Sequence, residues 1–143
     1  MLSGARAGVE KAMEIARERG VKRAVLLPVS APFHCALMQP AAEAMKDALA
    51  DAAIAWPRAP VVANVTAAPA SEPEEIRRLL VEQVTGAVRW RESVSFMAGA
   101  EVTKFVECGA GKVLTGLLKR IAPGVSGISV GAPGDLEAYR AFV

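Results

Sequence analysis

The fold class is indicated by the stretch TKFVECGAGKVL, residues 103–114. Its first part is an apolar run with β-forming residues, which predicts a strand from Thr103 to Val106. The glycines of Gly109-Ala110-Gly111 predict a tight turn, and apolar periodicity from Lys112 to Ile121 predicts a helix. A strand that passes through a turn into a helix is typical of the crossover units from which parallel sheets are built.

The rest of the chain shows the same alternation of strands and helices. Apolar patterns predict helices over 7–19, from Pro40 to before Trp56, after a capping-box pattern at 71–74, over 90–99 and from Asp135 toward Phe142, and strands over 24–29, 60–65 and 125–130. We therefore expect an α/β protein with a mostly parallel sheet. The chain begins directly on a helix and has few strands, so we expect it to be part of a larger domain.

Composition narrows the class of protein. The 143 residues suit one globular domain, and 52% hydrophobic residues with a net charge of +2 exclude a disordered chain. Aromatic residues make up only 5%, and the charges nearly balance, which argues against nucleic-acid binding. Cys35, Cys108 and a single histidine form no zinc or disulfide pattern. We therefore expect no bound metal. Because the sequence has no long apolar run, we also expect a soluble, cytoplasmic protein without a membrane segment.

His34 is the strongest candidate for a catalytic residue. It follows the predicted strand 24–29 in a loop that Pro28 and Pro32 stiffen, and histidine is the usual general base near neutral pH. A histidine with a purely structural role at the surface is the alternative.

Two further residues are weaker candidates for a nucleophile. Residues 127–131 match the pattern G-x-S-x-G around Ser129, but this segment is expected to be a strand and no helix start follows it. Cys108 could pair with His34 as a thiol nucleophile, although a small buried residue is the commoner role. Cys35 is expected to serve in packing.

Two other patterns favour structural roles over binding. The turn Gly109-Ala110-Gly111-Lys112 lacks the residues that a phosphate-binding loop or a dinucleotide fingerprint requires. A basic cluster across the end of the first helix is either a solvated helix end or a docking patch for an acidic partner; it consists of Arg17, Arg19, Lys22 and Arg23.

Three motifs together resemble one enzyme family, the bacterial malonyl-CoA:acyl carrier protein transacylases. They are LPVSAPFHCALM at 27–38, LVEQ at 80–83 followed by VRW at 88–90, and ECGAGKVLTGL at 107–117. Their order and spacing are similar to those of the family over almost the whole chain. Ala87, Cys108 and Ala110 depart from it, since the family usually has proline at the first and third positions and an aliphatic residue at the second.

The resemblance implies a fold. The family has an α/β-hydrolase-like core with a ferredoxin-like small subdomain inserted. Residues 1–30 would then be the second half of that subdomain, and residues 31–143 the C-terminal half of the core. The family's nucleophilic serine, in a Gly-His-Ser-x-Gly motif, and its carboxylate-binding arginine belong to an N-terminal half that this sequence does not contain. We therefore expect an isolated chain to be inactive and to self-associate through exposed apolar surface.

The resemblance also implies a reaction and the residues that serve it. The activity would be an S-malonyltransferase of fatty-acid biosynthesis, with malonyl-CoA and acyl carrier protein as partners and no cofactor. His34 would be the general base and acid, the Gln83 main-chain carbonyl would orient it at about 2.7–3.2 Å, and Phe33 and Asn64 would contact substrate. An acyltransferase domain of a polyketide synthase and a non-catalytic accessory fragment are the alternatives.

Overall fold

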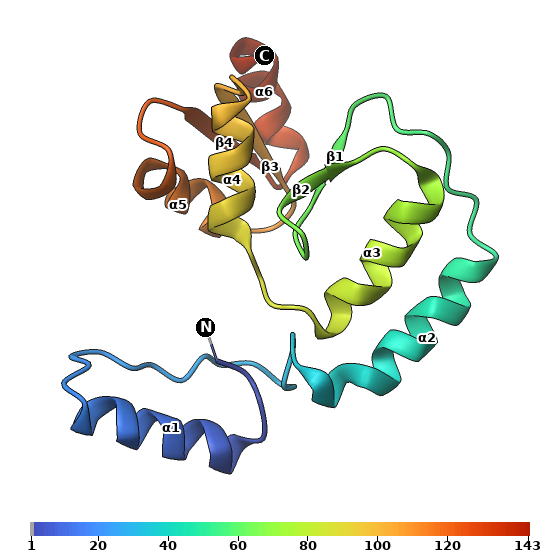
Figure 1. The fold of residues 1–143 in the computed structure, drawn as a ribbon. Coiled ribbons are helices and arrows are strands. Elements are labelled where there is room, and N and C mark those ends of the chain that lie inside the picture. Colours follow the sequence, from blue (N-terminus) through green and yellow to red (C-terminus); the bar gives the residue numbers. More distant parts are fainter. Residues whose placement is uncertain (1) are drawn as a thin grey trace. The chain divides into compact units, whose positions relative to one another are not determined.

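The computed structural model describes residues 2–143, so Met1, the first residue of the expected subdomain 1–30, lies outside it. The chain divides into two compact units, one ending at Arg89 and the other spanning Trp90–Val143. Figure 1 shows the elements of each unit. The expected boundary after residue 30, between a ferredoxin-like subdomain and the α/β core, stays a prediction.

The first unit contains the helices α1 (Arg6–Glu18), α2 (Gln39–Ala50) and α3 (Pro73–Thr85), and the short 3-10 helix η1 (Ala36–Met38). The predicted helices are confirmed, and α1 ends just before Gly20, whose φ of 83° is readily adopted by glycine. The capping box at Ser71 is wrong, because Glu72 occupies the N-cap position and makes no side-chain cap. Glu72 precedes Pro73, which keeps its backbone extended and delays the helix by one residue.

A short hairpin completes the first unit. The strands β1 (Val61–Ala63) and β2 (Ala68–Ala70) pair antiparallel, with Val61 opposite Ala70 and Ala63 opposite Ala68. The helix α3 packs against both β1 and α2 (Figure 1). The strand predicted over 60–65 is thus confirmed in its middle, but it belongs to a hairpin and to no parallel sheet.

The strand predicted over 24–29 is wrong. These residues form no strand, since no segment within 2–143 pairs with them, and the Val29 N–H bonds locally to the Leu27 carbonyl at 2.9 Å. A strand requires a neighbour for its N–H and C=O groups, and apolar character alone does not supply one. Val25, Leu26, Leu27 and Val29 are all exposed.

The second unit is a small parallel sheet with helices around it. It consists of α4 (Trp90–Gly99), β3 (Lys104–Cys108), α5 (Val113–Ile121), β4 (Ser126–Val130), a 3-10 turn η2 (Pro133–Asp135) and α6 (Leu136–Phe142). β3 and β4 pair parallel, with Val106 opposite Ile128. The core is formed by Val94, Leu118 and Ala122. The expected parallel sheet is therefore present here, limited to two strands.

The glycine turn of residues 109–111 has the conformation that its sequence predicts. Gly109 and Gly111 have φ of 128° and 97°, values that other residues rarely adopt. A Cβ on nearby Gly131 would lie 2.9 Å from the Gly109 carbonyl oxygen, so the end of β4 approaches this turn closely. Within residues 2–143, no helix is both long and apolar enough to cross a lipid bilayer.

Candidate active site

His34 lies in a turn immediately before η1, with its side chain half-buried. Its Nδ1 is 3.3 Å from the main-chain oxygen of Gln83, slightly beyond the expected distance and still within hydrogen-bonding range. Two motifs separated by 49 positions are thus brought together. His34 also has a φ of 61°, which is unusual for a residue with a side chain.

The Gln83 carbonyl is available because of its place in α3. This helix ends at Thr85, and the last four carbonyls of a helix lack partners within the helix. The C-terminal end of a helix also carries partial negative charge, which favours an N–H donor at that place. The helix end therefore supplies an acceptor for Nδ1–H, and within residues 2–143 the Nε2 atom has no hydrogen-bond partner.

A chain of amide hydrogen bonds lies behind this contact. The Arg89 N–H donates to Asn64 Oδ1 at 2.8 Å, and Asn64 Nδ2 donates to Gln83 Oε1 at 2.6 Å and to the Ala87 carbonyl at 3.2 Å. Gln83 Nε2 donates to the Gly86 carbonyl at 3.2 Å. Each amide is bonded through both its oxygen and its nitrogen, so neither could be rotated by a half-turn without placing like groups together.

Gln83 offers His34 two different partners. Its side-chain Nε2 is 3.3 Å from His34 Nδ1, the same distance as its main-chain oxygen. The oxygen can only accept a hydrogen bond and so favours the tautomer with Nδ1–H, whereas the amide N–H can only donate and favours the tautomer with Nε2–H. The family resemblance implied the carbonyl alone; the side-chain contact has no local sequence signal.

His34 lines an open groove of about 880 Å³ in the first unit. Figure 1 shows α1 and the segment that follows it running alongside each other. The groove is lined by apolar residues of both, among them Val9, Met13 and Leu27, and by Phe33, whose side chain is exposed. Phe33 and His34 therefore border the same apolar space, whereas the Asn64 amide forms hydrogen bonds with Gln83, Ala87 and Arg89.

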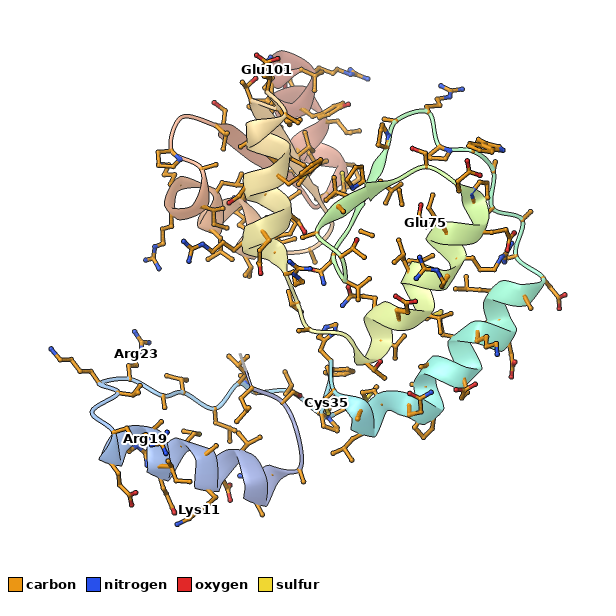
Figure 2. All side chains as sticks on the ribbon, in the orientation of Figure 1. Lys11, Arg19, Arg23, Cys35, Glu75 and Glu101 are labelled. Carbon is orange, nitrogen blue, oxygen red and sulfur yellow. The ribbon has the colours of Figure 1, made fainter. Side chains whose placement is uncertain are left out.

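The other candidate nucleophiles lie in different surroundings. Ser129 is within β4, as expected, and its hydroxyl contacts the Thr115 hydroxyl at 2.8 Å and donates to Glu107 at 3.3 Å. Cys108 is exposed at the end of β3. The thiol of Cys35 donates to the Pro32 carbonyl at 3.1 Å, and Figure 2 shows it in the segment before α2.

Glu107 has a structural role that the sequence did not reveal. Its carboxylate accepts the N–H groups of Leu114 and Thr115 at 3.1 and 2.9 Å, and so caps the start of α5 from the neighbouring strand. The bond from the Thr115 N–H contributes most to lowering the pKa of Glu107; partial desolvation opposes it, and the Thr115 hydroxyl, the Leu114 N–H and Ser129 add to it. Asp135 likewise accepts the Gly131 and Ala132 N–H groups, which lower its pKa.

The basic cluster of Arg17, Arg19, Lys22 and Arg23 is exposed, and within residues 2–143 none of the four forms an ion pair. Figure 2 shows Arg19 and Arg23 at the end of the first unit that is remote from Cys35, the neighbour of His34. The same described residues contain no group of three or more His, Cys, Asp or Glu that could hold a metal ion.

Comparison with known proteins finds relatives along the whole chain. The malonyl CoA-acyl carrier protein transacylase of Haemophilus influenzae is 43% identical over 143 residues, and that of Bacillus subtilis 42% identical over 137 residues. A crystal structure of the acyl-carrier-protein-S-malonyltransferase of Bartonella henselae matches 95% of the chain with a TM-score of 0.86 and 51% identity. The chain is homologous to the malonyl CoA-acyl carrier protein transacylases.

The similarity covers only a part of those transacylases. The chain spans 46% of the Haemophilus transacylase, 43% of the Bacillus transacylase and 44% of the Bartonella malonyltransferase, and the part it matches is their C-terminal portion. No model of a known protein family matches the chain. A polyketide biosynthesis protein of Burkholderia thailandensis is 36% identical over 129 residues, which are 11% of its length.

Proposed function

We propose that this chain supplies the histidine half of a malonyl-CoA:acyl carrier protein S-malonyltransferase, with His34 as general base and acid. The observation that carries the proposal is the contact of His34 Nδ1 with the Gln83 carbonyl, at 3.3 Å, beside a groove lined by the same histidine. With Nδ1 protonated, Nε2 keeps its lone pair and can accept a proton from a nucleophile.

The proposed reaction consists of two acyl transfers. His34 Nε2 takes the hydroxyl proton of a serine, supplied by the portion of the transacylases that this chain does not match, and the serine oxygen bonds to the malonyl carbonyl carbon. The carbon–sulfur bond of malonyl-CoA breaks, and the departing sulfur receives the proton from His34. The thiol of the carrier's phosphopantetheine then gives its proton to His34, attacks the serine ester and leaves with the malonyl group, while the proton returns to the serine.

A neutral carbonyl behind the histidine suits this exchange. It fixes the tautomer as a carboxylate does, but it stabilises the imidazolium less. The overall reaction exchanges one thioester for another, so the histidine has to give up its proton readily in both directions.

The remaining site residues extend the proposal. Phe33 would border the acyl group, and Asn64 remains a proposed substrate contact. The acyl carrier protein would be the acidic partner, since four cations that form no ion pair within the described residues gather between Arg17 and Arg23. A solved neighbour, 40% identical with a TM-score of 0.84, is a malonyl-transacylase in complex with an acyl-carrier protein of a polyketide system. No cofactor is required by this chemistry.

The finer fold assignment and the pathway are part of the same proposal. Residues 31–143 would be the C-terminal half of an α/β-hydrolase-like core and residues 1–30 a remnant of a ferredoxin-like subdomain. Fatty-acid biosynthesis is favoured over a polyketide synthase domain, because the curated relatives at 40–43% identity are transacylases of which the chain spans 43–46%, whereas the polyketide biosynthesis protein is 36% identical over 11% of its length.

The test is a chimaera that joins the N-terminal portion of the Haemophilus transacylase to this chain. We expect it to transfer radiolabelled malonyl from malonyl-CoA to acyl carrier protein, and His34→Ala to lower kcat by about 10²- to 10⁴-fold, the usual contribution of a general base. Cys35→Ala, in the neighbouring residue, is the matched control and should retain activity. A folded chimaera without transfer, or one unaffected by His34→Ala, would contradict the proposal.

A further inference from the structure

The orientation of the Gln83 side-chain amide is set by backbone groups that follow α3. The Arg89 N–H can only donate, and Asn64 Oδ1 accepts it at 2.8 Å. The Ala87 carbonyl can only accept, and it receives a hydrogen bond from Asn64 Nδ2 at 3.2 Å. The same Nδ2 donates to Gln83 Oε1 at 2.6 Å, so the backbone determines, through Asn64, which end of the Gln83 amide is the nitrogen.

The amide nitrogen of Gln83 is thereby placed beside the imidazole ring. One of its two hydrogens bonds to the Gly86 carbonyl at 3.2 Å, and the other is available for His34 Nδ1, which is 3.3 Å away. The Gln83 main-chain oxygen is at the same distance from Nδ1. The oxygen requires a proton on Nδ1 and the amide N–H requires a lone pair there, so the two contacts exclude each other and form in different tautomers of the ring.

We propose that the Gln83 side chain is a positioning residue whose role is opposite to that of its own carbonyl: its amide, held by Asn64 and Gly86, keeps a share of His34 in the tautomer protonated at ring Nε2. The carbonyl alone would fix the tautomer with Nδ1–H, and the amide opposes it. This inference rests on the proposed function only for its consequence, which is that a ring protonated at Nε2 cannot take a proton from a nucleophile.

The two contacts are similar enough for both tautomers to be populated. Each is a single hydrogen bond between neutral groups at 3.3 Å, and neither is strong enough to exclude the other. Free histidine favours the Nε2–H tautomer. A variant that merely loosened the turn would therefore move the ring toward Nε2–H, whereas loss of the amide donor alone should move it toward Nδ1–H. The direction of the shift separates the proposed role from a general structural one.

His34 is the only histidine of the chain, so its ring ¹⁵N resonances report the ratio of the two tautomers at an alkaline pH where the ring is neutral. We expect both tautomers in the unmodified chain. Gln83→Met keeps the main-chain carbonyl and the length of the side chain but removes the donor. It should shift the ratio about two- to tenfold toward Nδ1–H, the effect of one neutral hydrogen bond. Thr66→Ala is the matched control, since Thr66 lies in the same hairpin turn as Asn64 and its hydroxyl donates to the Ala63 carbonyl; it should leave the ratio unchanged.

Asn64→Asp is a second variant, which covers the case in which Gln83→Met does not fold. The carboxylate still accepts the Arg89 N–H, but it can only accept from Gln83 as well. The Gln83 amide then has to turn its nitrogen toward the carboxylate and its oxygen toward Nδ1. The ratio should again shift toward Nδ1–H, with no further shift when Gln83→Met is already present.

The proposal is overturned by a ring entirely in the Nδ1–H form in the unmodified chain. It is also overturned by a ratio that stays unchanged or moves toward Nε2–H in folded Gln83→Met or Asn64→Asp, or by a shift in Thr66→Ala as large as that in Gln83→Met. An equal shift from Asn64→Asp with and without Gln83→Met would overturn it too, because the carboxylate would then act without the amide. These spectra need no substrate, so their outcome is independent of whether the chimaera transfers malonyl.

Discussion

At the scale of the residue, His34 combines backbone strain with a defined ring contact. A non-glycine residue in the left-handed region costs about 1–3 kcal/mol, and such residues persist only where surrounding contacts hold them. Here the φ of 61° accompanies the Nδ1 contact to Gln83 and an N–H of Phe33 bonded to the Ala31 carbonyl at 2.9 Å. The turn therefore sets where the ring lies, and the Gln83 carbonyl is the acceptor that favours a proton on Nδ1.

Phe33 should limit the size of the acyl group that the site accepts. Its side chain borders the same groove as His34, and a ring beside the base leaves little room for an α-methyl branch. In the active chimaera, Phe33→Ser should raise the ratio of methylmalonyl to malonyl transfer by about 10-fold or more, since one methyl group is worth about 1–3 kcal/mol in a pocket. Competition between the two CoA esters measures the ratio. An unchanged ratio would exclude Phe33 from selectivity.

Glu107 should make the stability of the chain depend on pH. Hydrogen bonds, first that of the Thr115 N–H, hold its pKa below the ordinary value of 4.5. A carboxylate with a depressed pKa in the folded state stabilises the fold above its unfolded pKa, and this stabilisation is lost as the pH falls through the folded pKa. Thermal unfolding should show a lower Tm for Glu107→Gln at neutral pH, with the difference shrinking below about pH 4. A difference that is constant with pH would contradict the assignment.

At the scale of the element, helices could be predicted from local sequence patterns, whereas strands depend on pairing with distant segments and could not always be predicted. The helices of the first unit were predicted well because their apolar spacing, Pro73 and Gly20 are local signals. The segment 24–29 was not, since whether an apolar run is a strand depends on a partner elsewhere. Asn64 and Glu107 were missed as structural residues for the same reason: their hydrogen bonds reach residues 19 and 8 positions away.

The helix α3 depends on one of two adjacent leucines. Leu79 is 3% exposed and Leu80 is 47% exposed. Leu79→Ala should lower the free energy of unfolding by about 2–5 kcal/mol, whereas Leu80→Ala should change it by less than about 0.5 kcal/mol. Urea denaturation followed by circular dichroism compares the two. Because Gln83 is in the same helix, a folded Leu79→Ala chain should also show a weakened His34 contact in its ring ¹⁵N spectrum. Equal destabilisation by both substitutions would refute the packing assigned to α3.

At the scale of the whole molecule, the candidate site and the glycine motif at 107–117 lie in different units. His34, Asn64 and Gln83 all belong to the unit that ends at Arg89. The motif at 107–117 forms the turn from β3 to α5 in the other unit, and its carboxylate caps a helix. The sequence similarity that identified the homologues thus spans both units. The hydrogen bonds that define the candidate site lie in the first unit alone.

The exposed apolar segment of the groove predicts the behaviour of the chain in solution. Residues 24–29 present apolar side chains, including Leu27 at 53% exposure, and apart from the local bond from the Val29 N–H to the Leu27 carbonyl their backbone pairs with no other segment within residues 2–143; such a segment tends to pair with another chain. We expect sedimentation velocity to show concentration-dependent self-association. Leu27→Ser should weaken it about tenfold, because burial of a leucine side chain contributes about 1.5–3 kcal/mol when complete. Leu37→Ser is the control, since Leu37 is similarly exposed at 57% and does not line the groove. Equal effects of the two substitutions would place the contact elsewhere, and a monomer at all concentrations would refute the expectation.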